Sequence, residues 1–104
     1  MIGKIIVKKV GQKAEVVEID MNNLKAMQNI VEGYITTVKF TDDVLIVCNE
    51  DGERLELKPN VGVHDIVILG NIFFCSWEGE DFTGLNDGQI ENIMKLFNML
   101  DNGI

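Results

Sequence analysis

The segment from Val44 to Asn60, VLIVCNEDGERLELKPN, places the strongest constraint on the fold of this chain. Its first five residues are all apolar, which is typical of a strand that is covered on both faces. Polar and apolar residues then alternate from Arg54 to Lys58, as in a half-exposed strand. Pro59 is expected to end this strand, because proline cannot donate to a sheet ladder, and Asn60 to His64 are expected to form a loop after it. The segment therefore predicts a β-hairpin.

The turn of this hairpin, Asn49 to Glu53, admits two registers. A two-residue turn on Asp51-Gly52 sets Glu50 opposite Glu53, and like charges that face each other destabilise a sheet. A three-residue loop with Gly52 in the left-handed conformation avoids this contact. It places Cys48 beside Arg54, and we prefer it.

Segments rich in β-branched residues predict the other strands. Ile2–Val10 and Ala14–Ile19 are expected to form a hairpin around Gly11-Gln12-Lys13, because short loops containing glycine commonly join such strands. The further expected strands are Tyr34–Phe40, Ile66–Leu69 and Ile72–Trp77, the last of them followed by an acidic turn.

A first helix is expected to run to about Val31, since apolar residues recur there at three- and four-residue spacing. Asp20 or Asn22 is the expected N-cap, and Gly33 is expected to end the helix in the left-handed conformation. The stripe residues are Leu24, Met27, Ile30 and Val31.

A second helix is expected at the end of the chain. Asn86 and Gln89 have the spacing of a capping box, and Gly103 is the expected terminator. Its apolar stripe is Ile90, Ile93, Met94, Phe97 and Leu100. Two helices on one face of a mostly antiparallel sheet of about six to seven strands make one α+β domain over residues 1–104.

Composition is that of a soluble globular domain, with 46% hydrophobic and 25% charged residues. No apolar run approaches the length of about 18 residues that a membrane-spanning helix needs. The N-terminal segment mixes lysines into apolar positions, so we expect no signal peptide and a cytoplasmic location. Cys48 and Cys75 lie in apolar runs and are expected to be core residues.

The formal charge of −8 is unevenly distributed. The first thirteen residues carry four lysines and no acid, whereas acids predominate from Phe40 onward. An acidic surface repels nucleic acid and attracts a basic protein. The same acids also keep a small protein soluble, which is the plainer interpretation. The candidate partner-binding residues are Glu50, Asp51, Glu53, Glu78, Glu80 and Asp81.

Catalytic and metal-binding patterns are missing from the sequence. The cysteines and the single histidine lack zinc-ligand spacing, and the acids after Asn49 lack the spacing of a calcium loop. His64 and Asp65 are the one natural acid–base pair, but neighbouring residues usually point apart. No nucleophile, phosphate-binding or dinucleotide motif is present. We therefore expect no enzyme activity, no metal and no cofactor.

Six short motifs follow one another in a recognisable order. They are IVEGYI at 30–35, LIVCNEDG at 45–52, LKPN at 57–60, DIVILG at 65–70, EDF at 80–82 and LNDGQI at 85–90. Their order and spacing resemble the small bacterial and phage proteins grouped as domain of unknown function 3846. The family pattern often has arginine where this chain has Val61, which argues against an anion-binding role for that loop.

This resemblance implies an accessory protein of phages, plasmids and other mobile elements, sometimes encoded beside antirestriction genes. The first hypothesis is thus a non-enzymatic acidic binding protein that inhibits a host defence or nucleic-acid-handling protein, in the manner of an anti-restriction or anti-CRISPR protein. The second is a small-molecule or nucleotide binder, whose ligand site would comprise Asn60, His64, Asp65 and Trp77. The third is a homo-oligomeric domain without chemistry, with a homodimer formed through an edge strand or the end of the last helix.

Overall fold

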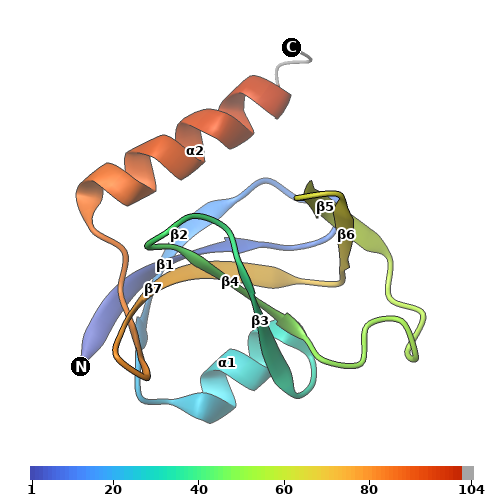
Figure 1. Cartoon of the computed structure of the whole chain (residues 1–104), viewed down its shortest axis with the longest axis horizontal. Coiled ribbons are helices and arrows are strands. Elements are labelled where there is room, and N and C mark those ends of the chain that lie inside the picture. The colour runs from blue at the N-terminus through green and yellow to red at the C-terminus, as the bar shows by residue number, and fades with distance from the viewer. Residues whose placement is uncertain (102–104) are drawn as a thin grey trace.

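The computed structural model describes residues 1–101 and has ten regular elements (Figure 1). In chain order they are β1 (Ile2–Lys8), β2 (Glu15–Asp20), α1 (Leu24–Val31), β3 (Ile35–Lys39), β4 (Leu45–Asn49), β5 (Pro59–Val63), β6 (Ile66–Leu69), β7 (Ile72–Glu78), β8 (Asp81–Thr83) and α2 (Asp87–Asp101).

Six strands form the main sheet, in the order β2-β1-β7-β4-β3 with β8 paired to β7. Every neighbouring pair in it is antiparallel. The strands β5 and β6 make a separate two-stranded sheet. The predicted α+β class with a mostly antiparallel sheet is confirmed.

The two helices pack on opposite faces of the main sheet (Figure 1). The expectation that both cover one face is wrong. Strand β7 explains why both faces are apolar, because its successive side chains alternate between two cores. Ile72 and Phe74 join the α2 side, whereas Phe73 and Cys75 join the α1 side.

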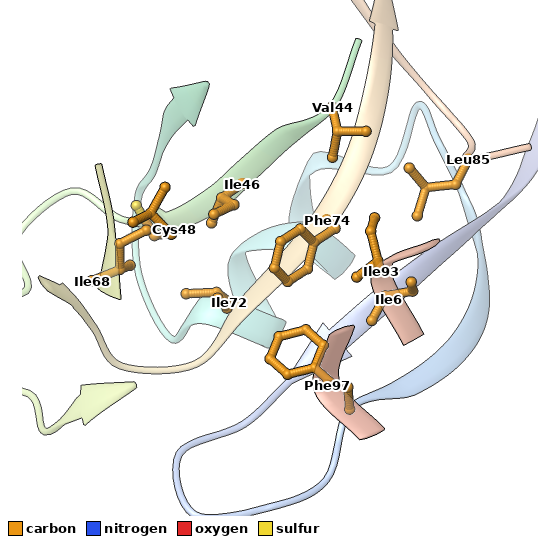
Figure 2. Packing of buried hydrophobic residues seen from close by; sticks show 12 residues of the cluster. Ile6, Val44, Ile46, Cys48, Ile68, Ile72, Phe74, Leu85, Ile93 and Phe97 are labelled. Carbon is orange, nitrogen blue, oxygen red and sulfur yellow. The ribbon is translucent and has the colours of Figure 1, made fainter. Parts of the chain in front are cut away.

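The larger core lies between the sheet, α2 and the β5–β6 hairpin (Figure 2). Its centre is Phe74, whose ring lies 5.3 Å from that of Phe40 and 5.7 Å from that of Phe97, both edge to face. Its buried residues are Ile6, Ala14, Val44, Ile46, Cys48, Val63, Ile68, Ile72, Phe74, Leu85, Ile93 and Phe97. The smaller core beneath α1 comprises Ile5, Val7, Met21, Met27, Val31, Val47, Phe73 and Cys75.

The predicted hairpin between β4 and Arg54–Lys58 does not form. Strand β4 has neighbours on both edges, since Cys48 pairs with Thr36 of β3 and Val47 pairs with Phe73 of β7. Both edges of β4 are occupied from Leu45 to Val47, where the hairpin would have to pair. The chain after Asn49 instead makes helical turns, with hydrogen bonds from Leu55 N to Asp51 O and from Leu57 N to Gly52 O. Both proposed registers are wrong, and neither Arg54 nor Leu55 lies opposite Cys48.

Pro59 begins a strand instead of ending one, which suits proline at a first strand position. The residues expected as a loop after it form β5, which is joined to β6 by the two-residue turn His64-Asp65. Both turn residues have positive φ, 49° and 69°, as a type I′ hairpin turn requires. The strand Ile66–Leu69 is confirmed, but it is only partly buried.

The first hairpin and the first helix differ from expectation at their ends. Val7 pairs with Glu15, so the β1–β2 loop is longer than the three residues expected. The α1 N-cap is Asn23, whose Oδ1 accepts from Ala26 N at 3.0 Å, and the left-handed residue is Glu32. Asp20 instead accepts from the N-terminal ammonium, at 3.2 Å.

The capping box of α2 is confirmed by two reciprocal hydrogen bonds. Asn86 N donates to Gln89 Oε1 and Gln89 N donates to Asn86 Oδ1, each at 2.8 Å. Ile93 and Phe97 are buried, whereas Leu100 is 59% exposed. The expected terminator, Gly103, lies outside the described residues.

Candidate functional site

The candidate acidic residues occupy two places at opposite ends of the sheet. Leu45 pairs with Cys75, and from that pair Glu50 and Glu78 lie in opposite directions along antiparallel strands. With about 3.3 Å per strand residue, Glu50 and Glu78 are about 26 Å apart. Glu78, Glu80 and Asp81 surround the β7–β8 turn. The six acids therefore do not form one surface.

The acids that follow β4 differ in their surroundings. Asp51 forms an ion pair with Arg54, at 3.2 Å, and its backbone N–H donates to Asn49 Oδ1 at 2.7 Å. In the chain up to residue 101, neither Glu50 nor Glu53 belongs to an ion pair. These two carboxylates are exposed and available to a partner.

Glu50 and Glu53 stand at the rim of a shallow groove of about 160 Å³, which we call the β6 groove. Two apolar residues of β6 are strongly exposed there, Ile66 at 47% and Val67 at 61%. The lining residues are Val38, Cys48, Asn49, Glu50, Gly52, Glu53, Ile66, Val67, Ile68 and Leu69. The groove thus combines an apolar floor with an acidic rim.

The β6 groove runs along an unpaired strand edge. Within residues 1–101, β6 pairs only with β5. The groove lies on the other side of β6, because no residue of β5 lines it and residues of β3 and β4 do. An unpaired edge carries backbone N–H and C=O groups that an extended peptide can pair with.

The residues predicted as a ligand loop do not converge. Trp77 alternates with Phe73 and Cys75 along β7 and so lies on the α1 side of the sheet, where it pairs with Phe82. Asn60, His64 and Asp65 belong to the β5–β6 hairpin, which packs on the other side.

Asn60 and His64 hold the hairpin in place. Asn60 Nδ2 donates to Lys8 O and to Gly70 O, both at 2.8 Å, and so joins the β5–β6 hairpin to β1. His64 Nε2 lies 3.1 Å from Phe40 O. Asp65 is exposed at the turn. These contacts support a structural role for the segment.

Both cysteines are buried and unpaired. Burial raises the pKa of the Cys75 thiol to about 12 and raises the pKa of Cys48 above its usual value. A thiol must ionise to act as a nucleophile, so neither cysteine is prepared for catalysis at neutral pH. In the described chain, no helix is both long enough and apolar enough to cross a membrane.

Sequence reasoning proposed Glu50 and Glu53 as partner-binding residues but did not propose Ile66 and Val67. A run of four apolar residues normally predicts burial, and nothing in the local pattern marks these two as exposed. Their exposure depends on the tertiary structure, because it is determined by which edge of β6 pairs with another strand.

One family model matches the chain, over residues 3–98, and it is described as Domain of unknown function (DUF3846). No curated protein matches the chain, and no solved structure does.

Proposed function

As this chain belongs to the domain of unknown function 3846 family, whose description names no activity, we propose that it is a non-enzymatic protein that binds an extended segment of a partner in the β6 groove. The observation that carries the proposal is the pair Ile66 and Val67, exposed on a strand with one unpaired edge. Soluble proteins rarely leave such an edge apolar unless something covers it.

The chemistry of the partner segment follows from the groove. Strand addition to β6 supplies backbone hydrogen bonds, and the apolar floor accepts alternate side chains of the added strand. Glu50 and Glu53 at the rim favour lysine or arginine at the positions between. The expected segment therefore alternates apolar and basic residues.

The identity proposed for the partner is a basic host protein that handles nucleic acid or defends the cell. The charge of −8 supports this choice, because it favours encounter with a basic surface. Inhibition would follow if the bound segment is one that the host protein needs for its own activity.

Two double charge reversals test the proposal. Glu50→Lys/Glu53→Lys changes the rim of the groove, and the matched control Glu78→Lys/Glu80→Lys makes the same charge change at the other end of the sheet. The tagged wild-type protein first captures a partner from host lysate. The purified partner is then titrated with each variant by calorimetry.

The groove variant should raise the Kd at least about tenfold, because two rim charges change from attractive to repulsive. The control should stay within about threefold, since it alters only the long-range attraction. Equal losses in both variants would show that net charge alone drives binding, and unchanged affinity in the groove variant would refute the site.

A further inference from the structure

A second groove lies between α2 and the β3–β4 turn, and it is separate from the β6 groove. Its volume is about 290 Å³, close to the lower end of small-molecule sites at about 300 Å³. Its floor is apolar, from Phe40, Val44, Ile93 and Leu96. Two of these residues, Val44 and Ile93, are also buried members of the larger core around Phe74 (Figure 2).

The walls of this α2 groove are tied together by hydrogen bonds. Gln89 of α2 donates through Nε2 to Asp43 Oδ2 at 3.0 Å and to Asp43 O at 3.3 Å. Ser76 Oγ of β7 donates to the same carbonyl at 2.6 Å. These bonds connect the helix, the turn and the central strand, so the groove is formed before any ligand arrives.

Asp43 places a negative charge at the edge of the apolar floor. Its carboxylate accepts from the Thr41 hydroxyl at 2.8 Å and from Gln89, and these two neutral donors lower its pKa below the usual value. Among residues 1–101 the ion pairs involve Asp20, Asp42 and Asp51, and none involves Asp43. The exposed carboxylate is ionised and held by two hydrogen bonds, and no described residue neutralises its charge.

We propose that the α2 groove binds a small organic amine, with its ammonium group on Asp43 and its apolar body between Phe40, Val44, Ile93 and Leu96. Charge complementarity decides the class, since the ionised carboxylate attracts a cation and repels an anion, while a neutral ligand gains no ion pair with it. The ligand is a free small molecule, because the cavity suits a single ring with a short chain. This inference does not depend on the partner proposed for the β6 groove.

The probe is 2-phenylethylamine hydrochloride, titrated into ¹⁵N-labelled protein and followed by amide chemical shifts. Phenylacetate, 2-phenylethanol and ammonium chloride serve as comparisons that remove the cation or the apolar body. Binding of phenylethylamine should move the amides of 40–44 and 89–96 and should exceed that of each comparison. Shifts confined to other residues, or a comparison that binds equally well, would overturn the site.

Asp43→Asn removes the charge and keeps the side-chain shape. It should weaken binding about tenfold or more, since a charge-assisted hydrogen bond is lost. Asp42→Asn is the matched control, because Asp42 is the neighbouring acid on the same turn and pairs with Lys39 at 3.5 Å. Equal weakening in the two variants would refute a specific role for Asp43.

A second variant keeps the test independent of any effect of Asp43 on folding. Leu96 is 44% exposed, so Leu96→Lys should fold normally while placing a competing cation over the floor. It should abolish the shifts caused by phenylethylamine. Wild-type affinity in Leu96→Lys, or no response of the wild-type protein to the probe, would overturn the proposal.

Discussion

Asn49 is the polar residue buried most completely in the described chain, and it joins two elements. Its Nδ2 donates to Val31 O at 3.1 Å and to Glu32 O at 3.3 Å, which satisfies carbonyls at the end of α1. Its Oδ1 accepts from Asp51 N. Gly33 leaves room for this amide, because a Cβ there would lie 2.6 Å from Asn49 Nδ2.

Replacing Asn49 by alanine should destabilise the protein by about 3 kcal/mol, because buried donors and acceptors lose their partners. Urea unfolding measures this as a lower midpoint with an unchanged slope. Asn98→Ala, at an exposed position of α2, should change stability by at most about 0.5 kcal/mol. A loss below about 1 kcal/mol in Asn49→Ala would contradict the assigned role.

The same residue shows what the sequence cannot predict at this scale. In the sequence, Asn49 reads as the first residue of a turn, and its contact with Val31 spans 18 positions. The short-range bonds of Asn86 and Gln89 are predictable, since both partners lie within one helical turn. Polar contacts follow from sequence when they are local and not otherwise.

Among the elements, the link between β8 and α2 decides which face α2 covers. This link passes directly over β1, where Leu85 N donates to Lys4 O at 2.8 Å. The close approach requires two glycines. A Cβ on Gly84 would lie 2.8 Å from Gly3 Cα and 2.9 Å from Lys4 N, and both are backbone atoms that cannot move aside easily.

Gly84→Ala should therefore cost about 1–3 kcal/mol, the usual range for a side chain forced into filled space. Gly62→Ala is the control, since the nearest atom to its added Cβ is 3.8 Å away. Thermal unfolding followed by circular dichroism compares the two. If both variants melt like the wild-type protein, the crossing is less tight than the geometry indicates.

Helices and strands were predictable where the apolar residues recur with a regular period. They were less predictable where several strands could pair with the same edge of a neighbouring strand. Both helices and the strand Ile72–Trp77 were predicted from their own residues. Arg54–Lys58 has the alternation of a strand, yet β3 and β7 occupy both edges of β4. The site follows the same rule: Glu50 and Glu53 were predicted from composition, whereas the exposure of Ile66 and Val67 depends on an edge that no neighbour covers.

At the scale of the molecule, three strands, β1, β4 and β7, contribute buried residues to both cores, and β7 lies between the other two in the sheet. Phe73 and Phe74 are consecutive in β7, and each is buried on a different face. Any change that shifts β7 alters the packing of both helices. The core on the α1 side and the core on the α2 side should therefore unfold as a single unit. This is a physical reason to expect two-state behaviour from a chain with two separate cores.

Phe97→Ala tests this coupling from the α2 side. The substitution removes a ring 5.7 Å from that of Phe74 and should cost about 3–5 kcal/mol. The single tryptophan, Trp77, lies on the α1 side and reports that layer by fluorescence, while far-UV circular dichroism reports the helices. The unfolding midpoints of both signals should move to lower urea by the same amount, because β7 transmits the loss of stability.

Leu100→Ala, exposed on the same helix, should leave both midpoints nearly unchanged. A tryptophan transition that keeps the wild-type midpoint while the helical signal falls would mean that the two layers unfold separately.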